Sequence, residues 1–121
     1  MATKKTLVIG ASENPDRYSN LAVKKLTAYH HPVVALGRRP GSIGPTTIET
    51  EKKAFADIDT VTLYLNSHNQ KEYYSYILSL HPKRIIFNPG AENDELEELA
   101  RQNGIATQEA CTLVLLSTGQ Y

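Results

Sequence analysis

The sequence predicts a single α/β domain over residues 1–121. We expect a three-layer architecture in which helices cover both faces of a doubly wound parallel sheet of five to six strands. Two observations carry this prediction. Short apolar, β-branched runs alternate along the chain with segments of helical periodicity. The chain has 121 residues, the length of one compact domain, and it contains no low-complexity tract, internal repeat or linker.

The first three predicted elements form one βαβ unit of about 30 residues. Residues 6–10 are a short apolar run, typical of a strand buried on both faces. Apolar residues then recur at helical spacing over residues 21–29, and Ser19 or Asn20 is placed to cap this helix. The apolar residues 33–36 form the second strand.

The rest of the chain continues the alternation. We expect further strands over residues 46–49, 60–65, 84–87 and 105–108. We expect helices over residues 69–80, 94–103 and 112–117. Parallel sheets bind ligands beyond the carboxyl ends of their strands, where the strand order reverses. This rule selects the loops at residues 10–19, 37–41, 66–68, 88–92 and 109–112.

Composition excludes several classes of protein. The 13 Lys and Arg residues balance 13 Asp and Glu, which argues against nucleic-acid binding driven by counterion release. The longest apolar runs are too short to span a membrane, and the N-terminal one is too short for a signal peptide. The single cysteine, Cys111, cannot form an internal disulfide, which fits a reducing compartment. We therefore expect a cytoplasmic protein that binds neither nucleic acid nor membranes.

The loop after the first strand predicts a phosphate site. Gly10, Ala11 and Ser12 are small, so backbone amides there can approach a phosphate closely. Arg17 adds a charged donor set that suits a diphosphate, and Ser19 could bind the same anion or act only as a helix cap. The dinucleotide motif G-x-G-x-x-G is absent, because the next glycine comes only after the second strand.

The second strand ends in the basic turn Gly37-Arg38-Arg39. An NAD-binding fold usually has an acidic residue here for the ribose hydroxyls, whereas a basic residue accommodates an extra phosphate on the ribose. The turn therefore favours coenzyme A (3′-phosphate) or NADP (2′-phosphate) over NAD. The alternative is a pair of solvated loop arginines.

These motifs resemble those of a known family. Residues 8–12 (VIGAS) and 14–19 (NPDRYS) are similar to the opening signature of the short, stand-alone CoA-binding-domain proteins. That family has a Rossmann-like fold similar to the nucleotide-binding domain of the succinyl-CoA synthetase α subunit. The likeness continues nearly end to end, through residues 58–61, 86–93, 104–105 and 109–111.

The resemblance implies a binding site for coenzyme A or an acyl-CoA at the carboxyl edge of the sheet. By this resemblance the residues that would hold the diphosphate are Gly10, Ala11, Ser12, Arg17 and Ser19. The turn around Arg38 would meet the adenosine part. Candidates for the remaining contacts lie in the later loops: Asn66, Asn88, Gly90 and Cys111. Cys111 could face the thiol of the ligand, or it could be a small buried apolar residue.

No catalytic or metal-binding set emerges from the sequence. The four histidines lack metal-ligand spacing, and no Ser-His-Asp or Cys-His arrangement can be assembled. We therefore expect a non-catalytic binding or regulatory module. The alternatives are a small NADP-dependent reductase, a partial acyl-CoA ligase subunit that acts with a partner, and an interaction subunit with a vestigial site. If exposed, Tyr73, Tyr74 and Tyr76 could form a homodimer patch.

Overall fold

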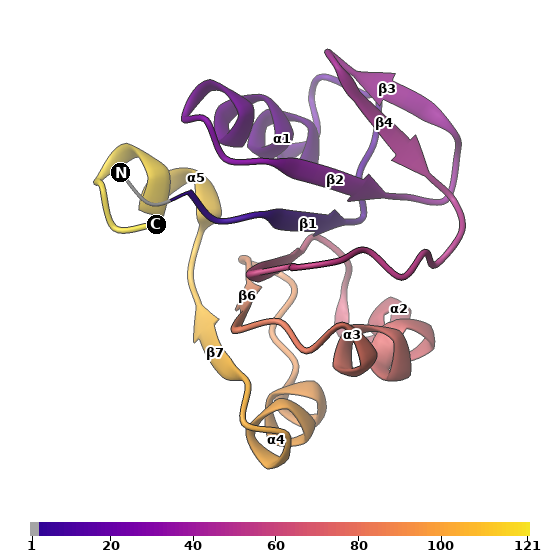
Figure 1. Cartoon of the computed structure of the whole chain (residues 1–121), viewed down its shortest axis with the longest axis vertical. Helices are drawn as coiled ribbons and strands as arrows, with labels where there is room; N and C mark the ends of the chain where they lie inside the picture. The colour runs from indigo at the N-terminus through magenta and orange to yellow at the C-terminus, as the bar shows by residue number, and fades with distance from the viewer. Residues whose placement is uncertain (1–2) are drawn as a thin grey trace.

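The computed structural model describes residues 3–121 as a sheet with helices on both faces (Figure 1). The expected domain, residues 1–121, includes residues 1 and 2, which lie outside the described residues. The strands are β1 (Thr6–Ile9), β2 (Val33–Leu36), β3 (Gly41–Ile43), β4 (Thr46–Glu49), β5 (Thr60–Leu63), β6 (Arg84–Phe87) and β7 (Ala106–Glu109). The helices are α1 (Tyr18–Ala28), α2 (Ser67–Gln70), the 3-10 helix η1 (Lys71–Tyr73), α3 (Tyr74–Leu80), α4 (Asp94–Gln102) and α5 (Thr112–Ser117).

The sheet has the order β3-β4-β2-β1-β5-β6-β7, so the strand order reverses between β1 and β5. All neighbours pair in parallel except β3 and β4, which form an antiparallel hairpin. The three-layer, doubly wound α/β prediction is confirmed. The predicted number of five to six strands is wrong, because the sheet has seven. β3 was missed because it has only three residues, Gly-Ser-Ile, too few to show a strand pattern.

Each face of the sheet has its own apolar core. Successive side chains of a strand point to opposite faces, and β1 shows this directly. Leu7 and Ile9 belong to the cluster that includes Ile77 of α3 and Leu96 of α4. Val8 belongs to the second cluster, with residues of α1 and α5. All four residues of β1 are buried, which confirms the strand expected to be covered on both faces.

Two helix predictions need correction. α1 begins at Tyr18 with Arg17 at the N-cap position and no side-chain capping bond, so neither Ser19 nor Asn20 caps it. Both residues instead lie buried in the first turn. The helix expected over residues 69–80 is divided into α2, η1 and α3.

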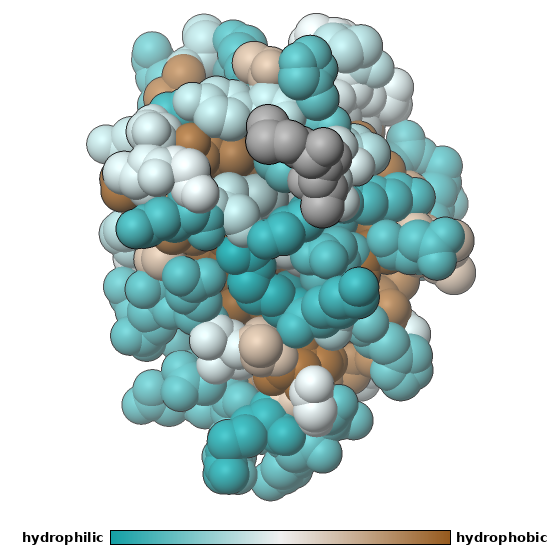
Figure 2. Space-filling model, turned by 60° about the vertical axis from the view of Figure 1, so that its left-hand side comes forward, coloured by the Kyte–Doolittle hydropathy of each residue, from teal (hydrophilic) through white to brown (hydrophobic). Residues whose placement is uncertain are grey.

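The surface of the domain is largely hydrophilic. On the face shown in Figure 2, hydrophobic residues appear only in scattered patches. Within residues 3–121, no helix is both long and apolar enough to cross a membrane. Tyr73 is buried, and Tyr74 and Tyr76 pack partly buried against the core, so these three side chains do not form the exposed patch that a dimer would need.

Candidate functional site

A cleft of about 950 Å³ opens at the carboxyl edge of the sheet, where the strand order reverses. This volume is in the range of small-molecule binding sites. The loops that follow β1, β2, β5 and β6 form its walls. Eight of the residues predicted for the site line this cleft: Gly10, Ala11, Ser12, Arg17, Ser19, Arg38, Arg39 and Gly90.

Gly10 allows the chain to leave β1 in the required direction. Its φ is +95°, a conformation that side-chain-bearing residues rarely adopt. A Cβ atom there would lie 3.1 Å from the carbonyl group of Tyr64, so a side chain would force the loop and the end of β5 slightly apart. The amides of Gly10 and Ala11 both donate to the carbonyl of Leu36, at 2.9 and 3.0 Å. These two amides are therefore already engaged within the protein, and the phosphate contact predicted for Gly10 and Ala11 stays a prediction.

The next part of the loop keeps free donors. Among the described residues, no hydrogen bond engages the amides of Ser12 and Glu13. Asn20 is buried in α1 and its Nδ2 donates to the carbonyl of Ser12 at 2.9 Å, which fixes the loop to the helix. Asn14 closes a tight turn, because its Oδ1 accepts from the amide of Asp16 at 2.9 Å. Ser12 and Glu13 are therefore the loop positions whose amides can meet an anion.

Gly37 does not line the cleft, yet it sets the position of the loop. A Cβ atom at Gly37 would lie 2.4 Å from the carbonyl oxygen of Ala11 and 3.0 Å from a side-chain carbon of Ile48. Only a glycine therefore lets the end of β2 approach the loop this closely. The amide of Gly37 donates to the carbonyl of Glu49 at 2.9 Å, so the basic turn begins from a fixed backbone.

Positive charge gathers on one side of the cleft. Arg17, Arg38 and Arg39 line it and are exposed, so their guanidinium groups can reach a ligand. Two acids, Glu13 and Asp16, line it as well. The Oε2 atom of Glu13 accepts from the amide of Ser42 in β3 at 3.0 Å, which ties that carboxylate to the sheet edge. Three arginines against two acids leave a net positive lining, which favours an anionic ligand.

A buried polar network holds the opposite wall. The Nε2 atom of Gln70 donates to the carbonyl oxygens of Leu65 and Ala91, which both line the cleft, at 2.8 and 2.7 Å. Its Oε1 accepts from Asn93 Nδ2 at 2.8 Å. The same Asn93 amide donates to Tyr74 Oη at 2.8 Å, and its Oδ1 accepts from the amide of Leu96 and caps α4. Gln70 and Asn93 were not predicted for the site, because no local pattern marks a glutamine that the fold will bury.

Three other predicted site residues lie outside the cleft lining, like Gly37. Asn66 is the N-cap of α2, where its Oδ1 accepts from the amide of Asn69 at 2.9 Å. Asn88 is buried, and its amide group donates to Thr62 and to the carbonyl of Leu63, while its Oδ1 accepts from the amide of Thr112. Asn88 therefore connects β5 to the start of α5. Cys111 is half-buried at the N-cap position of α5.

A cluster of three acidic residues lies apart from the cleft lining. The carboxylates of Asp94, Glu97 and Glu109 have ligand atoms within 4.8 Å of one another. They belong to α4 and the end of β7, and none of them lines the cleft. Exposed acidic groups of this kind are common on protein surfaces, and nothing else in the described residues points to an ion there.

Comparisons with known proteins match this chain to one protein family and to solved structures. The family model described as "CoA binding domain" matches residues 4–117. A solved structure described as an uncharacterized protein is 48% identical, with a TM-score of 0.97, and the alignment covers 100% of both chains. A search of curated proteins finds no match.

Two more distant solved structures share the Rossmann-like fold. A hypothetical protein from Pyrococcus horikoshii OT3 has a TM-score of 0.86 at 20% identity, over 96% of this chain and 83% of its own. A protein from Thermus thermophilus has a TM-score of 0.82 at 16% identity, over 98% of this chain and 91% of its own.

Proposed function

Because the chain belongs to the CoA binding domain family, we propose that its cleft binds coenzyme A, or an acyl-CoA, as a non-catalytic binding or regulatory module. The family supports CoA binding in general. The observation that carries the finer proposal is the gathering of Arg17, Arg38 and Arg39 around one cleft at the reversal of strand order. Sheets of this type bind nucleotides at that point.

The loop between β1 and α1 suits the diphosphate. The free amides of Ser12 and Glu13 and the guanidinium of Arg17 are donors at the same end of the cleft. α1 begins at Tyr18 with no acidic residue in its first turn. A helix N-terminus in this arrangement favours phosphate groups.

Arg38 and Arg39 suit a phosphate on the ribose. They follow β2, at the position where NAD-binding folds carry an acid for the ribose hydroxyls. Both guanidinium groups are exposed at the cleft, and arginine binds phosphate through paired hydrogen bonds. CoA and NADP each carry such a phosphate, and the family favours CoA.

The proposed role is binding without a covalent step. Among residues 3–121, no histidine or cysteine lines the cleft. Ser12 and Ser19 line it, but in the described residues neither hydroxyl is hydrogen-bonded to a carboxylate or imidazole that could activate it as a nucleophile. Hydride transfer from NADPH to a carbonyl substrate would favour the alternative of a small reductase, and acyl-CoA synthesis with a second subunit would favour a ligase.

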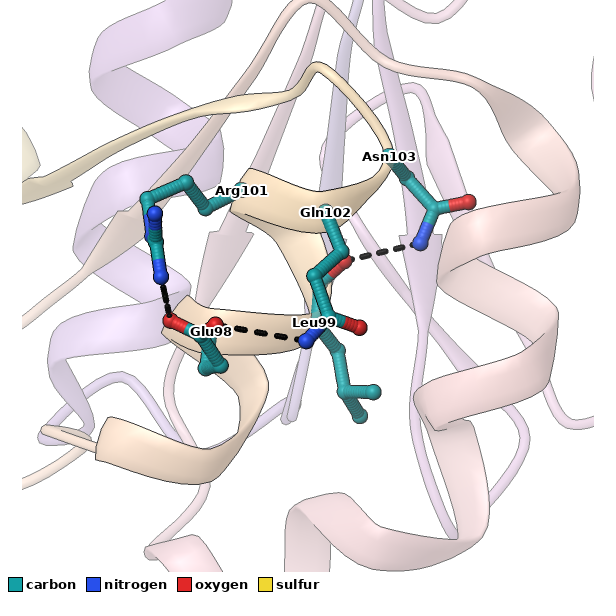
Figure 3. Close-up of polar contacts among 5 residues, drawn as sticks. All are labelled: Glu98, Leu99, Arg101, Gln102 and Asn103. Atoms are coloured by element: carbon teal, nitrogen blue, oxygen red, sulfur yellow. Dashed lines mark hydrogen bonds and ion pairs between the residues drawn. The ribbon is translucent and has the colours of Figure 1, made fainter.

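Calorimetric titration with CoA, 3′-dephospho-CoA, NADP and NAD tests the proposal. We expect CoA to bind and the loss of the 3′-phosphate to weaken binding about tenfold or more, since a charge-assisted contact contributes about 1.5–3 kcal/mol. We expect Arg17→Ala to cost a similar amount. Arg101→Ala is the matched control, because Arg101 lies on α4 and pairs with Glu98 (Figure 3).

Two outcomes contradict the proposal. One is no binding of CoA at millimolar concentration, and the other is equal affinity with and without the 3′-phosphate. CoA affinity that is unchanged in Arg17→Ala would favour a vestigial cleft with a ligand held elsewhere.

A further inference from the structure

The cleft wall opposite the arginines carries no charge. It is formed by the loops after β5 and β6, and the residues that line it are Tyr64, Leu65, Asn69, Pro89, Gly90 and Ala91. The Tyr64 phenol is uncharged at neutral pH, as an ordinary tyrosine is, and burial raises its pKa further. The cleft therefore has one side suited to phosphates and one side suited to an uncharged group.

Three backbone amides of this wall are already paired within the protein. The amide of Tyr64 donates to the carbonyl of Ile9 at 3.0 Å, and the amide of Ala91 donates to the carbonyl of Asn88 at 2.8 Å. The amide of Gly90 donates to Glu92 Oε1 at 2.9 Å. A carboxylate placed against this wall would find these three amides already paired. Within the described residues only neutral donors, the amide of Leu65 and the side-chain amide of Asn69, are unpaired there, whereas the loop after β1 adds the guanidinium of Arg17 to its two free amides.

Glu92 adds a negative charge beside the wall. Its carboxylate lies within hydrogen-bond distance of Gly90, which lines the cleft, and the hydrogen bond to the Gly90 amide fixes its position. No arginine or lysine lines this side of the cleft in the described chain. A second carboxylate here would find no cationic partner and would be repelled by Glu92.

We propose that this neutral wall, with Glu92 as the specificity-determining residue, selects CoA thioesters of uncharged acyl groups over thioesters of dicarboxylic acids. The inference rests on the proposed function, because it assumes that the phosphates of the ligand occupy the arginine side. The acyl end is then left to the opposite wall, where small and apolar groups can pack against Leu65, Pro89 and Ala91.

Butyryl-CoA and succinyl-CoA form a matched pair of probes, because their acyl groups have four carbons and differ in a terminal methyl or carboxylate. Calorimetric titration of the full chain with CoA and with both thioesters gives the selectivity. We expect butyryl-CoA to bind about fivefold or more tightly than succinyl-CoA. In Glu92→Gln, which keeps an oxygen for the Gly90 amide, we expect the ratio to fall to about twofold.

Glu95→Gln is the control, since it removes the same charge from an exposed residue in the first turn of α4. We expect it to leave the ratio unchanged. Equal affinity of the wild type for the two thioesters, with CoA itself bound, overturns this inference and leaves the proposed function standing. Failure of CoA to bind overturns the proposed function and the inference with it. A ratio that Glu92→Gln does not lower, or that both variants lower equally, overturns the role of Glu92.

Discussion

Replacing Gln70 by leucine removes the link between the two loops that form the uncharged wall. Gln70 is completely buried at the end of α2. Its side chain makes three hydrogen bonds of 2.7–2.8 Å, to the carbonyls of Leu65 and Ala91 and to the amide group of Asn93. Leucine has a similar size but no polar atoms, so it fills the space and leaves those three partners unpaired.

The expected loss follows from these contacts. A buried polar group left without its partner costs about 1–3 kcal/mol. Asn93 keeps its bond to Tyr74 Oη, and the leucine gains apolar contacts, so the lower end of that range applies to each lost bond. Three bonds then predict a decrease of about 3 kcal/mol in the free energy of unfolding. For a domain of this size this corresponds to a decrease in Tm of about 10 °C or more.

Urea unfolding followed by circular dichroism measures this decrease. Gln102→Leu is the matched control, because Gln102 is exposed on α4 and its Nε2 donates only to Glu98, at 3.2 Å. We expect the control to change stability by less than about 0.5 kcal/mol. The reasoning is refuted if Gln70→Leu lowers stability by less than about 1 kcal/mol, or by no more than the control. We also expect Gln70→Leu to weaken CoA binding, since the carbonyls it releases belong to the cleft wall.

Two further predictions concern the cleft and the opposite edge of the sheet. Gly37→Ala should lower stability by about 1–3 kcal/mol and weaken CoA binding, because its Cβ would lie 2.4 Å from the carbonyl oxygen of Ala11. Gly44→Ala should lower stability by about 1–2 kcal/mol through its positive φ and leave CoA affinity unchanged; an equal loss of binding in both variants would contradict this. Burial lowers the pKa of His31 below 6.5, so the unfolded chain takes up this proton more readily than the folded one. Stability should therefore decrease as the pH falls below about 6.5, and His31→Gln should show a smaller decrease between urea titrations at about pH 7.5 and 5.5; an equal decrease in both proteins would speak against it.

The predicted and missed elements differ in how local their signals are. Strands β1 and β5 are buried at all four positions, and their residues are all β-branched or apolar, a composition typical of strands. β3 pairs only with β4 and has a single buried residue, Ile43, so it leaves no run to recognise. The break between α2 and α3 likewise has no proline or glycine to mark it.

The residues of the site also differ in whether the sequence alone could predict their roles. A parallel sheet brings every loop that follows a strand to one edge. The order of strands and helices was therefore sufficient to predict that the loops carrying Arg17 and Arg38 lie at the same edge. This order did not predict which residues at that edge line the cleft and which ones stabilise its walls through buried hydrogen bonds. Asn88 and Gly90 are two residues apart. Asn88 is buried and forms hydrogen bonds with β5 and α5, whereas Gly90 lines the cleft.

The sequence by itself determined the architecture, the family and the basic loops, because each depends on local patterns or on the connectivity of a parallel sheet. Only the tertiary structure decided the shape and charge of the cleft. It showed that the amides of Gly10 and Ala11 are already paired, that Gln70 holds the uncharged wall, and that Glu92 is hydrogen-bonded to Gly90 of that wall. The physical reason is that buried polar groups find their partners across long separations in sequence, as Gln70 does with Ala91, and no local pattern encodes such a pairing.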